Sequence, residues 1–210
     1  MGRPRQYDEA QILEGAKHIS AESGPQKLTI AAVAERAGVP VGSIYHRYAS
    51  RDEILAALWL DFVEAFQARW FAELEGADVP AAGLAAVRFT CEWVRRHPRE
   101  ARLMLLHRRE DFASERWPVS YRRRAEGLAR RAEAGVRQYA TRLTGRAGTA
   151  QVRAVRFALV DLPTAALKRD VEAGVPPSED VERLVLDTCA YALQRMARRQ
   201  PIRKPNRTRR

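Results

Sequence analysis

Hydrophobic residues recur at intervals of three and four along most of the chain, a spacing typical of helices that bury one face. Near the N-terminus one tight turn breaks this pattern. Ile30, Val33, Ala34 and Ala37 form the apolar face of a first short helix. Gly38 follows it and suits the left-handed residue after a helix end, so the chain is expected to turn there.

A second short helix is predicted directly after this turn. Pro40 fits its first turn, where the missing N–H group costs no hydrogen bond. Ile44 and Tyr48 lie four residues apart and are expected to pack inward, while most residues between them face outward. Two short helices joined by a glycine turn make a helix-turn-helix, whose second helix enters the major groove in DNA-binding proteins of this kind.

The residues around this turn resemble the TetR family of one-component transcriptional regulators. The matching segments are ILEGAKHISAESG at 12–24, LT at 28–29, AERAGV at 34–39, GSIYHRY at 42–48 and SRDE at 50–53. The resemblance covers the first part of the chain and implies an all-α fold of about nine helices. In that fold an N-terminal three-helix helix-turn-helix domain sits on a larger helical ligand-binding and dimerisation domain.

The resemblance and the composition together predict four segments. A basic flexible arm occupies residues 1–5, and the DNA-binding domain occupies 6–66 with its helix-turn-helix motif at 29–48. The effector-binding and dimerisation domain covers 67–199. The basic tail 200–210 has no apolar face and is expected to be disordered.

Proline, glycine and serine residues mark the expected ends of the later helices. Ser50 and Glu53 have the spacing of a capping box at the start of a fourth helix, which is expected to reach about Glu75 with Ala65 in its apolar stripe. A loop is expected at 110–117, and Pro163 is expected to kink its helix about one turn earlier. The further expected helices span about 80–97, 98–108, 118–144, 149–173 and 178–199.

For DNA recognition the resemblance implies phosphate contacts from the ends of helices and base contacts from the second helix of the motif. Val41 stands where many relatives carry a polar or basic residue; it can meet a thymine methyl group but cannot hydrogen-bond guanine. His46 suits a phosphate contact as well as a base contact, and the arm can enter a minor groove or remain a disordered tip. The expected DNA-binding residues are Arg3, Arg5, Lys27, Thr29, Val41, Gly42, Ser43, Tyr45, His46, Arg47 and Arg51.

Aromatic and apolar residues are frequent in the region that the family uses as an effector pocket. Ordinary core packing explains any one of them, but together they favour a site for a flat or hydrophobic effector. His107 and Asp161 are the polar candidates, although an arginine partner or an exposed turn near Pro163 also explains Asp161. Arginine-rich helices nearby would suit an anionic effector such as an acyl-CoA. The expected pocket residues are Trp59, Phe62, Phe66, Phe89, Trp93, Met104, His107, Tyr121, Phe157 and Asp161.

The last two helices are apolar over more than one face, which indicates cover on two sides. A second subunit is the simplest cover for the outer side, and the resemblance also implies a homodimer. Two such heads would bind a near-palindromic double-stranded DNA operator. The expected interface residues are Val155, Leu159, Leu162, Leu167, Leu184, Val185, Thr188, Cys189, Leu193 and Met196.

The net charge of +11 and a pI of about 10.4 suit a polyanionic partner. The excess lies in 95–131 and in the C-terminal tail rather than in the predicted head, so a protein that binds DNA without sequence preference is the alternative. A repressor is favoured over an activator on the same scaffold. Cys91 and Cys189 stand alone and are expected to be small buried hydrophobes.

Several classes of protein lack support in the sequence. No nucleotide-binding, metalloprotease or paired-cysteine motif is present, so we expect no enzyme, no cofactor and no metal site. No run approaches the ~18 apolar residues of a membrane span, and the N-terminal residues lack the apolar core of a signal peptide. The expected location is the cytoplasm, in association with the nucleoid.

Overall fold

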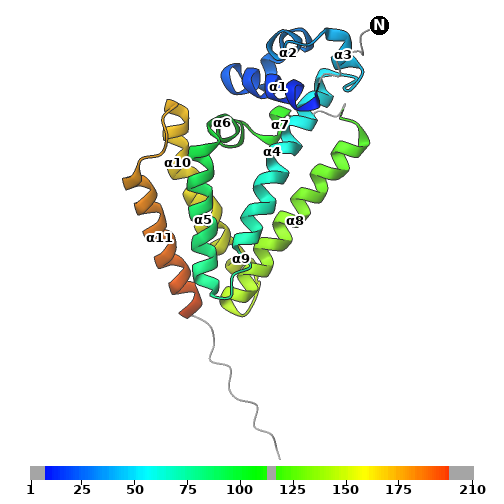
Figure 1. Cartoon of the computed structure of the whole chain (residues 1–210). Coiled ribbons are helices and arrows are strands. Elements are labelled where there is room, and N and C mark those ends of the chain that lie inside the picture. Colours follow the sequence, from blue (N-terminus) through cyan, green and yellow to red (C-terminus); the bar gives the residue numbers. More distant parts are fainter. Residues whose placement is uncertain (1–7, 113–116, 199–210) are drawn as a thin grey trace, which may run out of the picture.

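The computed structural model describes residues 8–112 and 117–198, and every regular element in these two ranges is helical (Figure 1). The predicted all-α fold is therefore confirmed. A small head stands at one end of a longer helical body. The head contains α1 (Glu9–Ser23), the single-turn 3₁₀ helix η1 (Pro25–Lys27), α2 (Ile30–Ala37) and α3 (Val41–Tyr45).

The body is built around α4, which begins under the head and runs far into the body (Figure 1). It packs against α5 and α8, and α11 packs against α5. The body contains α4 (Arg51–Glu73), α5 (Val79–Arg96), α6 (Pro98–Leu106), α7 (Arg109–Phe112), α8 (Val119–Thr144), α9 (Thr149–Arg156), the π-helical segment η2 (Phe157–Asp161), α10 (Leu162–Ala173) and α11 (Glu179–Arg198).

The predicted start and end signals of the head helices operate as hydrogen-bonded caps. The hydroxyl of Thr29 accepts from the N–H of Ala32 at 3.1 Å at the start of α2. Gly38 ends α2 with φ 65° and ψ 32°, the left-handed conformation that glycine adopts without strain. The helix-turn-helix is therefore set by local chemistry on both sides of its turn.

The capping box predicted for α4 forms with one difference. Ser50 accepts from the N–H of Glu53 at 3.2 Å, as expected. The carboxylate of Glu53 accepts from the N–H of Ala49 at 2.7 Å, one residue earlier than in the usual arrangement. Ala65, which we expected in the apolar stripe, is exposed because it lies on the solvent side of the helix.

The predicted distortion before Pro163 is a π-helical turn. Leu162 donates to the carbonyl of Phe157, five residues back, and Pro163 has no N–H to continue the ladder. The buried thiol of Cys189 lies 3.0 Å from the carbonyl oxygen of Ala158 and donates to it. Burial raises the pKa of this thiol to about 11, which keeps its proton in place.

Two hydrophobic cores share α4. The first half of this helix, with Ile54 and Leu58, packs in a core that includes the inner faces of the head helices. Trp70 near its end belongs to a second core formed with the rest of the body. The short helix α7 lies where part of a loop was expected, and Phe112 is buried there in the first core. A movement of α4 would thus change the packing of both cores.

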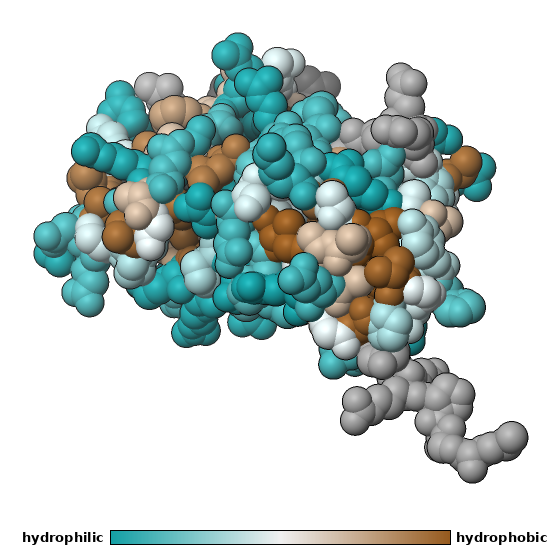
Figure 2. Space-filling view, turned by 90° about the horizontal axis from the view of Figure 1, so that it is seen from above, coloured by the Kyte–Doolittle hydropathy of each residue, from teal (hydrophilic) through white to brown (hydrophobic). Residues whose placement is uncertain are grey.

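Most of the surface seen from above is hydrophilic, with hydrophobic residues gathered in patches (Figure 2). Among the described helices none combines the length and the apolar character needed to span a membrane. Cys91 and Cys189 are both buried and unpaired, as the sequence indicated.

Candidate DNA-binding surface and ligand cavity

The second helix of the motif, α3, is anchored by its inner side and exposed on its outer side. Ile44 is fully buried and Tyr48, just beyond the helix end, is 1% exposed. The Tyr48 hydroxyl donates to the carboxylate of Glu9 on α1 at 2.9 Å, which fixes the helix against its neighbour. Val41 and Tyr45 are 44% and 56% exposed, so apolar and aromatic side chains stand in solvent on the outer side.

Most residues expected to contact DNA are accessible. A Cβ atom built on Gly42 meets no atom within 4 Å, so the outer side of α3 is bare at this position. Ser43 is half-buried. Arg3 and Arg5 lie outside the described residues. The exposed residues of the expected set are Lys27, Thr29, Val41, Gly42, Tyr45, His46 and Arg47.

Arg51 is placed differently from our expectation of a phosphate contact. Its Nε donates to the carbonyl of Leu28 and its Nη2 to the carbonyl of Pro25, both at 2.7 Å. Its Nη1 lies 3.3 Å from the carboxylate of Asp52. The guanidinium is directed inward because the carbonyls of the η1 turn face the first turn of α4.

A second joint connects the head to the body through α6. Arg102 donates from Nε to the carbonyl of Ala21 in α1 at 3.1 Å, and from Nη1 to the carbonyl of Val171 in α10 at 2.9 Å. Lys17 of α1 lies 2.8 Å from Glu100 of α6. The head is therefore fastened to the body at α6 as well as through α4.

An apolar cavity of about 210 Å³ lies inside the body. Of the ten residues predicted for the effector pocket, Phe66, Trp93 and Met104 line it. Phe89 does not line the cavity, but its ring packs against that of Phe66, with the ring centroids 5.5 Å apart. The lining residues are Val63, Phe66, Gln67, Trp70, Phe71, Thr90, Trp93, Val94, Met104, Leu105, Ala132, Val136, Leu159, Val160 and Thr164.

Polar groups take little part in the cavity wall. The hydroxyls of Thr90 and Thr164 bond the carbonyls of Ala86 and Val160 within their own helical segments, at 3.0 and 2.7 Å. Their hydrogen-bonding capacity is thereby engaged within the chain. Gln67 is the lining residue with a side-chain amide.

Three aromatic residues predicted for the pocket belong to the core beneath the head. Phe62 packs on Phe112 with ring centroids 6.0 Å apart, and Trp59 packs on Trp117 at 6.2 Å. Tyr121 packs against the same core. These three residues therefore do not line the body cavity, because the first half of α4 and the start of α8 face the core under the head.

The two polar candidates also lie away from the cavity. His107 is half-buried at the joint between head and body, where its Nδ1 is 3.9 Å from the carboxylate of Asp111. Burial lowers the pKa of His107. The nearby carboxylate of Asp111 raises this pKa, but by less than burial lowers it. Asp161 is exposed and lies 3.6 Å from Nε of Arg156, so the simpler explanation in terms of an arginine partner applies. Phe157 is 56% exposed on the outside of the body.

Most residues predicted for a dimer interface lie in the core of the single chain. The helices α5, α8 and α10 already cover much of α11, so its wide apolar character is largely explained within one subunit. Leu162 and Met196 are half-buried, and Leu184 and Thr188 are exposed. The residues that are instead buried are Val155, Leu159, Leu167, Val185, Cys189 and Leu193.

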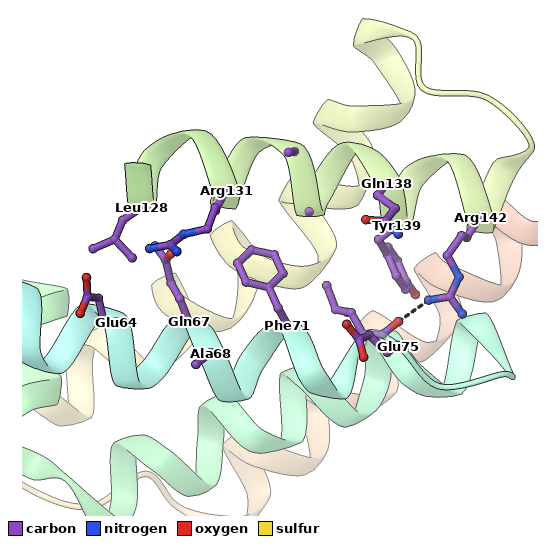
Figure 3. A pocket seen from close by; sticks show the side chains of 13 residues that line it. Glu64, Gln67, Ala68, Phe71, Glu75, Leu128, Arg131, Gln138, Tyr139 and Arg142 are labelled. Carbon is purple, nitrogen blue, oxygen red and sulfur yellow. Dashed lines mark hydrogen bonds between the residues drawn. The ribbon is translucent and has the colours of Figure 1, made fainter. Parts of the chain in front are cut away.

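A groove of about 600 Å³, more polar than the cavity, lies between α4 and α8 beside it (Figure 3). Glu64 of α4 accepts from Arg124 of α8 at 2.8 Å near one end of it. At the other end Arg142 donates to the carbonyls of Leu74 and Gly76. No hydrophobic periodicity indicates this groove, because its residues lie on the partly exposed sides of two helices.

No group of three His, Cys, Asp or Glu side chains that could hold a metal ion occurs within the described ranges.

Comparison with known proteins finds a family model that matches the head and solved structures that share the fold. Residues 12–58 match the model of bacterial regulatory proteins of the tetR family. No curated protein sequence matches the chain significantly. Among solved structures the fold resembles the fatty acid degradation regulator FadR from Bacillus halodurans, with 17% identity, a TM-score of 0.68, and coverage of 92% of this chain and 97% of that chain.

Two further structures are similar over nearly the whole chain. FadR from Bacillus subtilis in complex with stearoyl-CoA is 15% identical, with a TM-score of 0.65 and coverage of 92% of this chain and 100% of that chain. The ketosteroid regulator KstR2 of Mycobacterium tuberculosis is 19% identical, with a TM-score of 0.61 and coverage of 92% and 95%. The helix-turn-helix segment thus matches the TetR family model, and the chain as a whole shares the fold of these solved regulators.

Proposed function

We propose that this protein is a homodimeric, sequence-specific repressor that leaves a near-palindromic operator when a small hydrophobic or aromatic effector enters the body. The DNA-binding domain would span 6–66 and the effector-binding and dimerisation domain 67–199. The exposed side of α3 would read bases, and Lys27, Thr29 and Tyr45 would contact phosphates.

The continuity of α4 is the observation that carries this proposal. Its first residue, Arg51, is bonded to the carbonyls of Pro25 and Leu28 beside the helix-turn-helix. Four turns or more along the same helix, Phe66 and Trp70 stand in the cavity wall. A rigid helix transmits a displacement at one end to the other, so a ligand that shifts the wall would also shift the head.

The helix α6 offers a second route between the same two regions. Met104 and Leu105 line the cavity, and Arg102 in the same helix holds the carbonyl of Ala21 in the head. Met104, which lines the cavity, is thus two residues from Arg102, which contacts the head. A ligand that moves α6 would act directly on α1.

An exposed apolar surface supports the dimer. Leu184, Thr188 and Tyr191 follow one another on one side of α11, and Leu184 and Tyr191 are 68% and 65% exposed. Phe157 of η2 and Tyr191 line the same surface hollow between α9 and α11. Large apolar residues gathered at a surface favour association with a partner, here a second copy.

The cavity supports the class of effector. Its wall is almost entirely apolar, which favours a ligand with a hydrophobic part. FadR of Bacillus subtilis was solved with stearoyl-CoA, and KstR2 is described as a ketosteroid regulator, so hydrophobic groups occur among the ligands of similar folds. The effector would have to bind the operator-competent and released conformations with different affinity.

Selection of bound fragments from random duplex DNA, at about 150 mM salt, tests the proposal. A short inverted repeat is the expected result, because a dimer presents two α3 helices related by a two-fold axis. Uniform recovery of all sequences would instead support binding without sequence preference and would contradict the proposal. Reporter expression from the recovered site then separates a repressor from an activator.

A further inference from the structure

The apolar cavity and the more polar groove beside it have a common wall. Gln67 and Phe71, one turn apart on α4, line both of them, and no other described residue does so. From α8, Ala132 and Val136 face the cavity, while Arg131 and Gly135 face the groove. The separation between the two volumes therefore consists of side chains rather than backbone.

Phe71 occupies a place that exists only because residue 135 is glycine. A Cβ atom at Gly135 would lie 2.2 Å from Cε1 of the Phe71 ring, far inside contact distance. The ring also packs edge-on against Trp70 at 5.0 Å. Figure 3 shows Phe71 directed from α4 toward α8, across the middle of the groove.

Polar contacts hold α4 and α8 together on either side of this ring. The pair Glu64–Arg124 lies near one end of the groove, and the bond from Arg142 to the Leu74 carbonyl lies at the other. Between them, Phe71 closes the wall by packing alone. An aromatic ring can change rotamer without breaking a hydrogen bond, so this is the part of the wall that can open.

The chemistry differs on the two sides of Phe71. The cavity offers apolar surface, with its two threonine hydroxyls engaged within their own helices. The groove carries Arg131 and the amides of Gln67 and Gln138. The carboxylate of Glu64 is already neutralised by Arg124, whereas Arg131 has no hydrogen bond or ion pair to any described residue.

Size also favours use of both volumes together. The cavity alone, at about 210 Å³, is below the roughly 300–1,000 Å³ usual for ligand sites. Joined to the groove of about 600 Å³, it falls within that range. An amphipathic molecule would then place its apolar part among the aromatic residues and its head beside α8.

We propose that Phe71 is a gate between the cavity and the groove, and that the two together bind an amphipathic ligand whose anionic head is held by Arg131. This inference rests on the proposed function, since the same ligand would act as effector. It adds the chemical class of the ligand and the residues that select it. Passage of the ligand past Phe71 would separate the last turns of α4 from α8.

Binding of decanoate and of 1-decanol to the full-length protein tests the selection of the head group. The two probes share one alkyl chain and differ in charge, and quenching of Trp70 and Trp93 fluorescence reports their binding. Arg131→Gln is expected to weaken decanoate binding about tenfold and to change decanol binding by less than about twofold. Arg130→Gln, one residue away and outside the groove, is the matched control and should change neither.

Stopped-flow association of decanoate tests the gate. Phe71→Ala is expected to raise the association and dissociation rates at least about fivefold, because the ring no longer has to move. Phe71→Leu serves as a second variant with most of the apolar volume kept, and circular dichroism checks that both retain the helical fold. Rates within about twofold of the original protein in both folded variants would overturn the gate.

The remaining outcomes also decide the matter. Equal loss of decanoate and decanol binding in Arg131→Gln would overturn the assignment of the anionic head. Failure of the unmodified protein to bind either probe would overturn the amphipathic site. Neither result touches the selection of an inverted repeat from random DNA, which is measured without a ligand and tests the proposed function separately.

Discussion

Nε of Arg51 donates a 2.7 Å hydrogen bond to the carbonyl oxygen of Leu28, joining the first turn of α4 to the segment that leads into α2. The same side chain reaches the carbonyl of Pro25. The arginine therefore holds the helix-turn-helix at a fixed angle to α4. The charged guanidinium donates to two backbone carbonyls at the η1 turn, as a capping side chain does at the end of a helix.

Arg51→Gln should destabilise the protein by about 1–3 kcal/mol, because it leaves two carbonyls without a charged donor. Urea unfolding followed by circular dichroism measures this. Arg36→Gln is the control, since Arg36 makes an exposed ion pair with Glu22 and should cost less than about 1 kcal/mol. Unchanged stability together with lost operator binding would restore Arg51 as a phosphate contact.

Gly42→Gln should separate folding from DNA binding. A side chain at this position meets open space, so the variant should fold with stability equal to or above the original by up to about 1 kcal/mol. Operator affinity should fall at least about tenfold, because the added side chain stands between α3 and the groove floor. An electrophoretic shift assay with the selected operator measures the affinity.

Gly127→Gln provides the matched control for that experiment. Gly127 lies in α8 of the body, and a Cβ atom built there also meets no atom within 4 Å. This variant should keep both stability and operator affinity. Equal affinities for both variants would mean that α3 does not approach DNA through its Gly42 side.

Arg102→Gln should weaken the response to the effector more than it weakens either binding event. The arginine joins Ala21 in the head to Val171 in the body, and its loss removes two of the hydrogen bonds that fasten α6 to these regions. Titration of the ligand in the presence and absence of operator DNA gives the coupling, which should fall by about 1 kcal/mol or more. Arg96→Gln is the control, because the ion pair of Arg96 with Glu92, at 3.7 Å, stays within α5.

His107 should make stability depend on pH in the mildly acidic range. Its pKa in the folded protein is lowered by burial, so between that value and the ordinary value of about 6.5 the unfolded chain binds more protons. The free energy of unfolding should therefore fall as the pH drops below about 6.5. His107→Gln should show a smaller fall across the same range in urea unfolding at several pH values, and an identical fall would contradict this role.

Tyr191→Glu should produce monomers. It places a charge in the apolar surface formed with Phe157 and Leu184, where a partner subunit would have to desolvate it. Sedimentation velocity at micromolar concentration measures the distribution. Val119→Glu alters an exposed valine at the start of α8 and is the control. A Tyr191→Glu protein that remains dimeric would require an interface elsewhere.

Helix boundaries followed from the sequence where a cap or a terminator is local. Thr29, Gly38 and Ser50 each act within a few residues of their own position, and so does the missing N–H of Pro163. The match of 12–58 to the family model confirms the resemblance stated from those residues. Local hydrogen bonding is visible in sequence because its partners are close in sequence.

The residues of the cavity were harder to predict because packing partners are distant in sequence. Phe62 and Phe66 lie one helical turn apart on α4. Phe62 packs in the core under the head, whereas Phe66 lines the cavity. Hydrophobic periodicity places both phenylalanines on one face of α4. It does not show which other helix packs against each turn of that face. The same limit explains Arg51, whose carbonyl partners lie more than twenty residues earlier.

The π-helical segment Phe157–Asp161 has a consequence for insertions and deletions. A π turn holds one residue more than an α turn, and one residue rotates a helix by about 100°. Deleting a single residue there would let an α turn replace the π turn, so the helix after it would keep its direction and Leu167 and Val171 would stay in the core. The same deletion in the α turns of α9, where there is no extra residue to remove, would turn the helix after it by about 100°. The chain can therefore lose one residue in the π turn at less cost to its core than in the α turns before it.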